Sequence, residues 1–186
     1  QFIQADAASR RGLIQALEVL MSSVDIMAHA QKMTDAINCL REQGHHTHAV
    51  ILMHVAIDQF AWSSITNEKS EPKDFQNWVN DYMISKNPIG CTAEELWASR
   101  NGLIHMGTAE SAAHASGKVK NKIYYTVGNA GIVKNDITDV IFVNAEDLLM
   151  SFITGLLWFI EDLKKDPDSL KNTNSKLNRM LTYTNL

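Results

Sequence analysis

The chain has 186 residues, of which 45% are hydrophobic, and this length and composition suit one globular domain with a substantial core. The formal net charge is −4, so no overall positive field attracts nucleic acid, and an RNA site would need a local cluster of Lys and Arg. The two cysteines, Cys39 and Cys91, match neither the spacing of a metal site nor a disulfide framework. We therefore expect a protein of the reducing cytoplasm.

The sequence predicts no membrane segment. Its longest apolar stretch, residues 148–160, is shorter than the roughly 20 residues that cross a bilayer, so we expect a buried helix there. The chain also opens without the basic segment and following apolar segment of a secretory signal. We expect no membrane partner.

Apolar residues at helical spacing predict helices in the first third of the chain. We expect a helical extension over residues 1–24, then a helix that ends near Gly44. Residues 49–65 are apolar nearly all round, which is typical of a helix at the centre of a bundle. His54 and Asp58 are four residues apart and share one face of that helix, where a carboxylate needs a partner.

The helix that carries the most informative residues has a clear start. A short helix is predicted over residues 75–84, and a Pro–Ile–Gly segment then breaks the chain. Thr92 and Glu95 are spaced as in a capping box, which predicts the beginning of a helix that runs to Arg100.

The last third of the chain combines a β segment with two helices. Residues 118–127 and 140–143 are rich in β-branched and aromatic residues, so we predict a β-hairpin insertion at about residues 117–143. Asn144 is the expected cap of a long helix over residues 145–165. The tail, residues 166–186, predicts one more helix, polar enough to be loosely docked. The predicted fold class is therefore all-α, with one small β insertion.

The segment Arg100-Asn101-Gly102-Leu103-Ile104-His105 carries residue types that suit cleavage of RNA without a metal. That reaction needs a base for the 2′-hydroxyl proton, an acid for the leaving 5′-oxygen and positive charge on the phosphorane. Histidine serves as acid or base near neutral pH, and arginine stays charged and forks onto phosphate oxygens. One chain offers one histidine in this segment, so two chains would supply both proton-transfer groups.

This pattern of Arg, a polar residue and a His after a gap of four residues resembles the motif of the HEPN family. Residues 30–64 resemble the first two helices of that family, including a mid-helix acidic residue, here Asp58. The resemblance covers residues 25–165. It implies an antiparallel four-helix bundle and a metal-independent endoribonuclease of toxin or phage-defence type, with a composite site at a homodimer interface and no cofactor. RNA, an antitoxin or another protein would be its partners.

The sequence departs from the family pattern in three features. These are the predicted hairpin, the extra N-terminal helix and Gly107, which stands where some members place a Tyr. The subfamily and the substrate are therefore left open.

The resemblance also implies a role for each motif residue. Arg100 would stabilise the phosphorane, His105 would transfer protons, and Asn101 would position the phosphate or merely cap or orient. Asp58 and His54 would orient His105, or else form an ion pair or hydrogen bond within the bundle.

The spacing of the motif sets a geometric condition. On a regular helix, Arg100 and His105 point about 140° apart. We therefore expect them to meet only if Gly102 ends or distorts the helix, or if the Arg comes from a partner chain.

A basic strip lies close to the motif in sequence. Lys118, Lys120 and Lys122 alternate along the predicted strand, so they would share one face with Tyr124. Such a face would hold an RNA backbone and stack a base, or it would be the solvated face of an exposed hairpin.

Other residue types that suggest sites have simpler interpretations. His45, His46 and His48 suggest a metal by number, but a polar loop without cysteines favours solvated histidines and no metal. The four tryptophans, Trp62, Trp78, Trp97 and Trp158, stand at helical core spacing and are expected to pack in the core.

Two alternatives to the nuclease remain. One is a non-catalytic HEPN-like module that dimerises or binds a nucleotide or a partner protein. The other is a helical protein in which the motif arises by chance.

Overall fold

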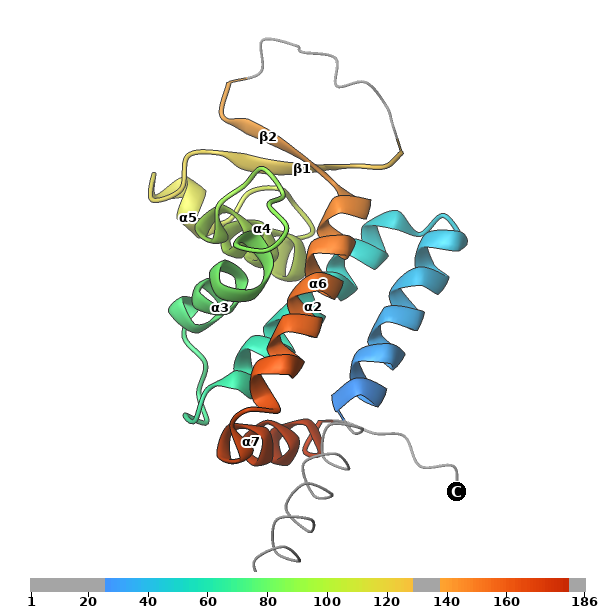
Figure 1. Ribbon diagram of the computed structural model, residues 1–186. Helices are drawn as coiled ribbons and strands as arrows, with labels where there is room; N and C mark the ends of the chain where they lie inside the picture. Colours follow the sequence, from blue (N-terminus) through green and yellow to red (C-terminus); the bar gives the residue numbers. More distant parts are fainter. Residues whose placement is uncertain (1–25, 129–137, 181–186) are drawn as a thin grey trace, which may run out of the picture.

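A computed structural model describes residues 26–128 and 138–180, and in this part the protein is mostly helical with one small sheet (Figure 1). The first described helix covers residues 26–42 and is the unlabelled blue helix of Figure 1. Gly44 follows it with a left-handed φ of +76°, a conformation that glycine adopts without a steric penalty. The predicted extension over residues 1–24 lies outside the described residues.

Helix α2 (His46–Ser64) is the central helix, as the sequence predicted. It contacts α3, α4, α6 and α7, and side chains on several of its faces are buried. The largest of these, Met53, Ile57 and Phe60, have no exposed surface. A helix that is surrounded by other helices has little contact with water, so an almost wholly apolar surface does not destabilise it.

Helix α3 (Pro72–Trp78) continues directly into a π-helical turn, η1 (Val79–Ile84), so the predicted short helix is longer and less regular. The η1 segment packs closely on α6. A Cβ placed on Gly155 of α6 would lie 2.9 Å from Met83 Cγ, so only glycine allows this approach. The two segments therefore form one tightly packed side of the core.

Helix α4 (Ala93–Met106) begins at the predicted capping box. Glu95 N donates to Thr92 Oγ1 at 3.2 Å, and Thr92 N donates to Glu95 Oε2 at 2.8 Å. The helix ends at Gly107, which has a left-handed φ of +65°. A single-turn helix, α5 (Ala112–Ala115), follows.

The predicted β-hairpin is wrong, because β1 (Lys122–Thr126) and β2 (Val140–Asn144) pair in parallel. Lys122 lies opposite Val140, and Thr126 lies opposite Asn144. The connection over residues 127–139 has the dozen or more residues that two parallel strands need between them. The loop of a hairpin is much shorter. Residues 129–137 of the predicted insertion lie outside the described residues.

The parallel order brings the end of β2 next to the end of β1, and α6 (Ala145–Leu163) starts there. Asn144 caps α6 as predicted, accepting from Glu146 N at 2.7 Å, and it also donates to the Gly128 carbonyl at 3.0 Å. The apolar run 148–160 lies within α6. Among the described residues, no helix has the length and apolar character needed to cross a membrane.

Two expectations about packing need correction. Trp158 is 47% exposed, with Lys86 Nζ 4.8 Å from the ring centre, so it is not a core residue. Helix α7 (Pro167–Leu177) is firmly docked rather than loose. It buries Leu170, Leu177 and the side chain of Lys176, whose ammonium group binds the backbone at the end of α2.

Candidate functional site

The guanidinium of Arg100 is the centre of a cluster of polar side chains from α2 and α4. Arg100 Nη2 donates to Asp58 Oδ2 at 2.5 Å. Arg100 Nη1 donates to Asn101 Oδ1 at 3.0 Å and to His105 Nε2 at 3.3 Å. Of the predicted site residues, the structure therefore brings together Arg100, Asn101, His105 and Asp58.

Packing holds the Arg100 side chain in this position. Only 16% of it is exposed, and its Cζ lies 5.1 Å from the centre of the Trp97 ring, one helical turn earlier on α4. A guanidinium over an aromatic face is attracted to it electrostatically. Trp97 was predicted as a packing residue only, although its spacing of three from Arg100 could have indicated this contact.

Arg100 and His105 meet within one regular helix, which differs from our expectation. Helix α4 is continuous through Gly102, so neither a helix break nor a partner chain is needed. The expectation considered only the directions in which the side chains leave the helix. The long arginine side chain instead runs along the helix surface, between Asp58 and the last turn of α4.

Gly102 has a different role, which is to let a loop lie against the helix. A Cβ at this position would lie 2.6 Å from the backbone oxygens of both Thr108 and Glu110. The segment after α4 therefore folds back onto the helix beside the motif. His105 is an exposed residue in the last turn of α4.

The folded-back loop, α5 and α4 border an open pocket of about 670 Å³, here called the motif pocket. Asn101 and His105 form part of its lining. The other lining residues are Met106, Thr108, Glu110, Ser111, Ala112, Ala113 and Ala115. The pocket has room for a nucleobase-sized group next to the polar cluster, and Ala112, Ala113 and Ala115 contribute apolar lining.

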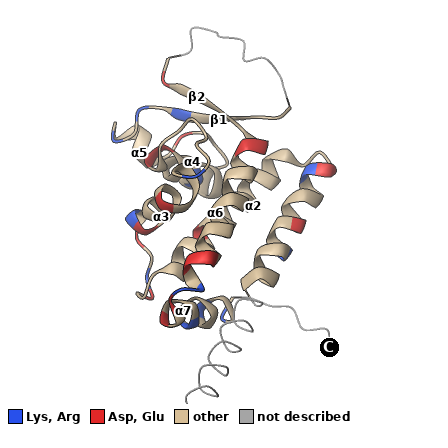
Figure 2. Cartoon of the chain, viewed as in Figure 1, with Lys and Arg blue, Asp and Glu red and all other residues tan. Residues whose placement is uncertain are grey.

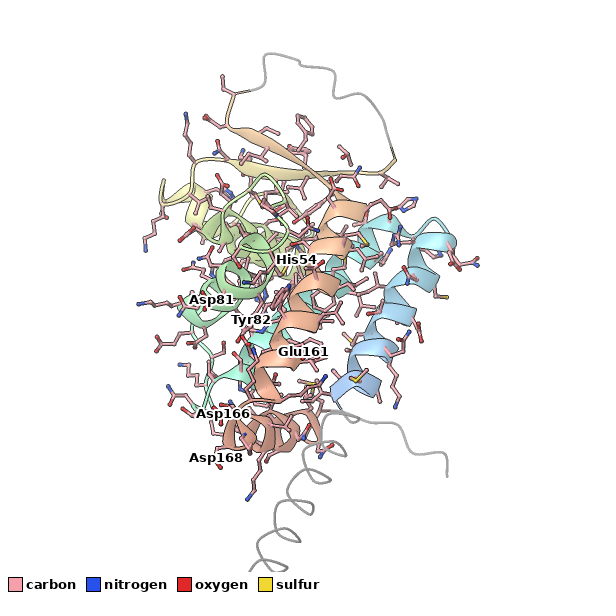
Figure 3. All side chains as sticks on the ribbon, viewed as in Figure 1. His54, Asp81, Tyr82, Glu161, Asp166 and Asp168 are labelled. Atoms are coloured by element: carbon pink, nitrogen blue, oxygen red, sulfur yellow. The ribbon has the colours of Figure 1, made fainter. Side chains whose placement is uncertain are left out.

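His54 does not reach this cluster. It is fully buried (Figure 3), and its Nε2 lies 2.7 Å from the Tyr125 hydroxyl, which in turn lies 2.9 Å from Ser99 Oγ. Burial, and then the charge of Arg100, lower the pKa of His54 to about 3. It stays neutral near pH 7 and belongs to a core hydrogen-bond network rather than to the cluster around Arg100.

The lysines of the predicted strip are divided between different partners. Lys118 and Lys120 precede β1, and Lys120 Nζ lies 2.9 Å from Asp139 Oδ1. Lys122, in β1, forms an ion pair with Glu110 at the edge of the motif pocket. In Figure 2 the Lys and Arg residues of the described part of the chain are interspersed with acidic ones.

The other predicted binding residues lie apart from the motif pocket. Tyr124 is 49% exposed, and its ring lies 6.3 Å from that of Phe142 in the neighbouring strand. It contributes to a separate hollow that also includes His46. The rings of His45 and His48 lie 5.9 Å apart. Within the described ranges, no group of three or more His, Cys, Asp and Glu side chains is placed to hold a metal ion.

Another histidine, not predicted as a site residue, lies in α5 between alanines that line the pocket. His114 Nδ1 accepts from Ser111 N at 3.1 Å, and His114 Nε2 lies 3.1 Å from the Asn121 carbonyl. It thus ties α5 to the segment before β1. Its contacts are local and backbone-directed, so no sequence motif indicates them.

Comparison of the chain with protein-family models, with curated proteins and with solved structures finds no match.

Proposed function

We propose that the protein is a metal-independent endoribonuclease with an HEPN-like four-helix bundle. The observation that carries the proposal is the 3.3 Å distance between Arg100 Nη1 and His105 Nε2 beside the motif pocket. At this separation, one phosphate oxygen can contact both groups. Asn101, which lines the pocket and binds the same guanidinium nitrogen, would help to position that phosphate.

The proposed reaction is an internal transfer of the phosphoryl group. The 2′-oxygen forms a bond to phosphorus as a histidine takes its proton, and the bond from phosphorus to the 5′-oxygen breaks as an acid returns a proton to that oxygen. The products are a 2′,3′-cyclic phosphate and a 5′-hydroxyl. Arg100 would stabilise the charge on the phosphorane.

The reaction has two proton-transfer steps, and His105 is the one motif histidine of a chain. We therefore include a homodimer in the proposal, with two motifs facing one cleft. Asp58 would hold each Arg100 in a fixed orientation, as a carboxylate does for a buried guanidinium. A toxin or phage-defence role in the cytoplasm, with an antitoxin or other protein partner, follows from the family resemblance.

The test is cleavage of structured RNA in the presence of EDTA. We expect the native protein to produce fragments with 2′,3′-cyclic phosphate ends. His105→Ala should lose at least about 100-fold in rate because it removes a proton-transfer group, and Arg100→Ala should lose a similar factor because it removes the charge that stabilises the phosphorane. His48→Ala is the matched control, because His48 is exposed and lies outside the cluster. Equal cleavage by native protein and His105→Ala, or no cleavage of any RNA, would contradict the proposal.

One observation favours the second candidate, a non-catalytic HEPN-like binding module. Arg100 is already paired with Asp58, and Lys120 and Lys122 are paired with acidic residues, so little positive charge is free near the motif pocket. RNA or nucleotide binding that is abolished by Arg100→Ala, in a protein without cleavage activity, would identify the module.

A further inference from the structure

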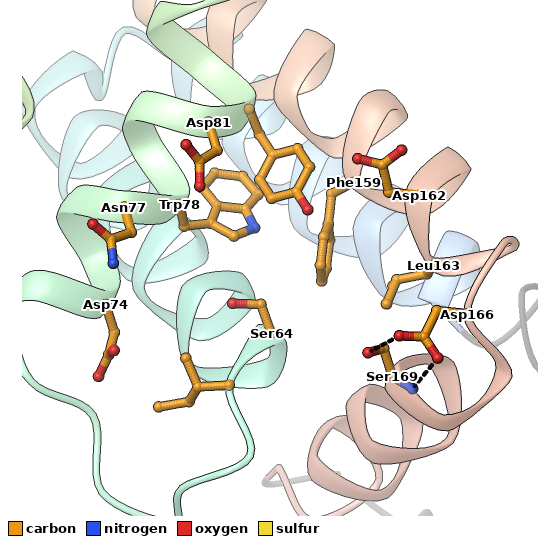
Figure 4. Close-up of a pocket in the computed structure, with 12 residues that line it drawn as sticks. Ser64, Asp74, Asn77, Trp78, Asp81, Phe159, Asp162, Leu163, Asp166 and Ser169 are labelled. Atoms are coloured by element: carbon orange, nitrogen blue, oxygen red, sulfur yellow. Dashed lines mark hydrogen bonds between the residues drawn. The ribbon is translucent and has the colours of Figure 1, made fainter.

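A second cavity, of about 260 Å³, lies where α3, η1, α6 and α7 meet, and it shares no residue with the motif pocket. Figure 4 shows its lining side chains converging on one space. Two kinds of residue dominate the lining. They are the carboxylates Asp74, Asp81, Asp162 and Asp166, and the aromatic residues Trp78, Tyr82 and Phe159. No Lys or Arg lines it, so we call it the acidic pocket.

The four carboxylates come from separate elements and keep a net negative charge. Asp166 caps α7 and accepts from Ser169 Oγ at 2.7 Å, and Asp74 accepts from Glu71 N at 2.8 Å. Asp162 is paired with Lys165 at 2.8 Å. Asp81 has no ion-pair partner among the described residues. A cation in this cavity would be attracted by several carboxylates at once.

The aromatic residues of the lining pack against one another. The Trp78 and Tyr82 ring centres are 5.7 Å apart, and the Tyr82 and Phe159 centres are 5.2 Å apart. Burial raises the pKa of the Tyr82 hydroxyl, and the charges of Asp162 and Asp81 raise it further, so both carboxylates act on this ring. Aromatic faces next to carboxylates suit an organic ammonium, which gains from both.

The indole nitrogen of Trp78 points to a second feature of the ligand. Trp78 is only 2% exposed, and its Nε1–H has no acceptor among the residues described. In Figure 4 this nitrogen is directed into the space that the lining side chains surround. A buried donor without an acceptor is unfavourable, so a ligand that brings an oxygen atom would satisfy it.

These features together distinguish an organic cation from a metal ion. A bare metal ion cannot accept a hydrogen bond, and within the described residues the acidic side chains are not gathered as metal ligands. We propose that the acidic pocket binds a small organic ammonium that also carries a hydroxyl or carbonyl oxygen. The ammonium lies among the carboxylates and aromatic faces, and the oxygen accepts from Trp78 Nε1. This site is independent of the proposed nuclease.

The first test follows the indole N–H resonances of ¹⁵N-labelled protein during titration with choline or ethanolamine. Trp78→Phe identifies the Trp78 signal. We expect one of the two probes to shift that signal at millimolar concentration, and tetramethylammonium, which has no oxygen, to bind more weakly. The proposal is overturned if neither probe shifts the Trp78 resonance, or if tetramethylammonium shifts it equally.

The second test removes charge without disturbing the core. Asp81 is exposed, so Asp81→Asn should fold normally and weaken binding of the active probe about fivefold, as a surface charge pair predicts. Glu161→Gln is the matched control, because it removes a charge one residue before Asp162 from outside the lining. Equal weakening by both variants would mean general charge attraction and would also overturn the proposal.

Discussion

Arg100 donates to Asp58, Asn101 and His105 at the same time, so its guanidinium is oriented before any ligand arrives. Preorganisation of this kind lowers the cost of binding a phosphate, because the side chain loses little further freedom. The same contacts also neutralise part of its charge. A phosphate at this site must therefore share Arg100 with Asp58 or displace it.

The first prediction at the residue scale concerns His54 and pH. Its pKa of about 3 in the folded protein lies below the ordinary value of 6.5. Between these two pH values, His54 is therefore protonated in the unfolded chain but not in the folded protein. The resulting stability is fully present above about pH 6.5 and is lost as the pH falls toward 3. We expect His54→Gln, which can still bond Tyr125, to flatten this dependence.

The measurement is urea unfolding of both proteins at pH 7 and pH 4. The native protein should lose more of its free energy of unfolding between these pH values than His54→Gln, by on the order of a few kcal/mol. Parallel curves for the two proteins would mean that His54 does not remain neutral in the fold.

A second prediction concerns Gly102. An Ala in the middle of a helix usually stabilises it by about 1 kcal/mol relative to Gly. Here the added Cβ would meet two backbone oxygens at 2.6 Å, so we expect Gly102→Ala to lower the free energy of unfolding by about 1–3 kcal/mol and to displace the loop beside His105. Urea unfolding gives the sign, and a stabilised variant would refute the close approach.

From the sequence we could predict only those features of the site that depend on residues close together along one helix. The caps at Thr92 and Asn144 and the helical position of the motif follow from local spacing, and all three are present in the structure. The contact of Arg100 with Asp58 and the loop against Gly102 depend on residues distant in sequence. No local pattern contains that information.

At the scale of elements, α7 shows how one polar residue can dock a helix. Lys176 Nζ donates to the carbonyls of Trp62, Ile65 and Asn67 at 2.6–3.0 Å, where the end of α2 leaves backbone acceptors without partners. The sequence predicted loose docking because α7 is polar. The prediction failed because this polar residue supplies hydrogen bonds that an apolar side chain could not.

We therefore predict that Lys176→Met lowers the free energy of unfolding by about 2–4 kcal/mol, since it leaves buried carbonyls unsatisfied. Lys171→Met is the matched control, because Lys171 is an exposed residue of the same helix and should change stability by less than about 0.5 kcal/mol. Thermal or urea unfolding provides the comparison. Similar losses for the two variants would show that Lys176 does not hold α7.

The sheet shows a feature that local sequence patterns could not predict. Both strands were found from their composition, the second at nearly its observed position, whereas the predicted first strand began at residue 118 and β1 begins at Lys122. Their relative direction was wrong. Composition identifies a strand by its own residues, whereas direction depends on the path of residues 127–139 and on where α6 must begin. Only the tertiary structure sets that path.

At the scale of the whole molecule, the proposed nuclease requires two chains. We predict that light scattering during gel filtration gives twice the 20.8 kDa mass of one chain. Met106, 55% exposed beside His105, should then lie at or near the interface, so Met106→Glu should produce monomers. Met150→Glu on α6 is the matched control with 54% exposure. A monomeric native protein would contradict the composite site.

The connection between β1 and β2 is the covalent link between the part of the fold that ends with β1 and the part that begins with β2. If the gene were divided between the codons for residues 128 and 138, the C-terminal fragment would carry β2, α6 and α7. Its contacts with the N-terminal fragment, through the sheet and through η1 against α6, are non-covalent and extensive. We expect the two fragments to reassemble when they are co-expressed, which pull-down of one tagged fragment would detect.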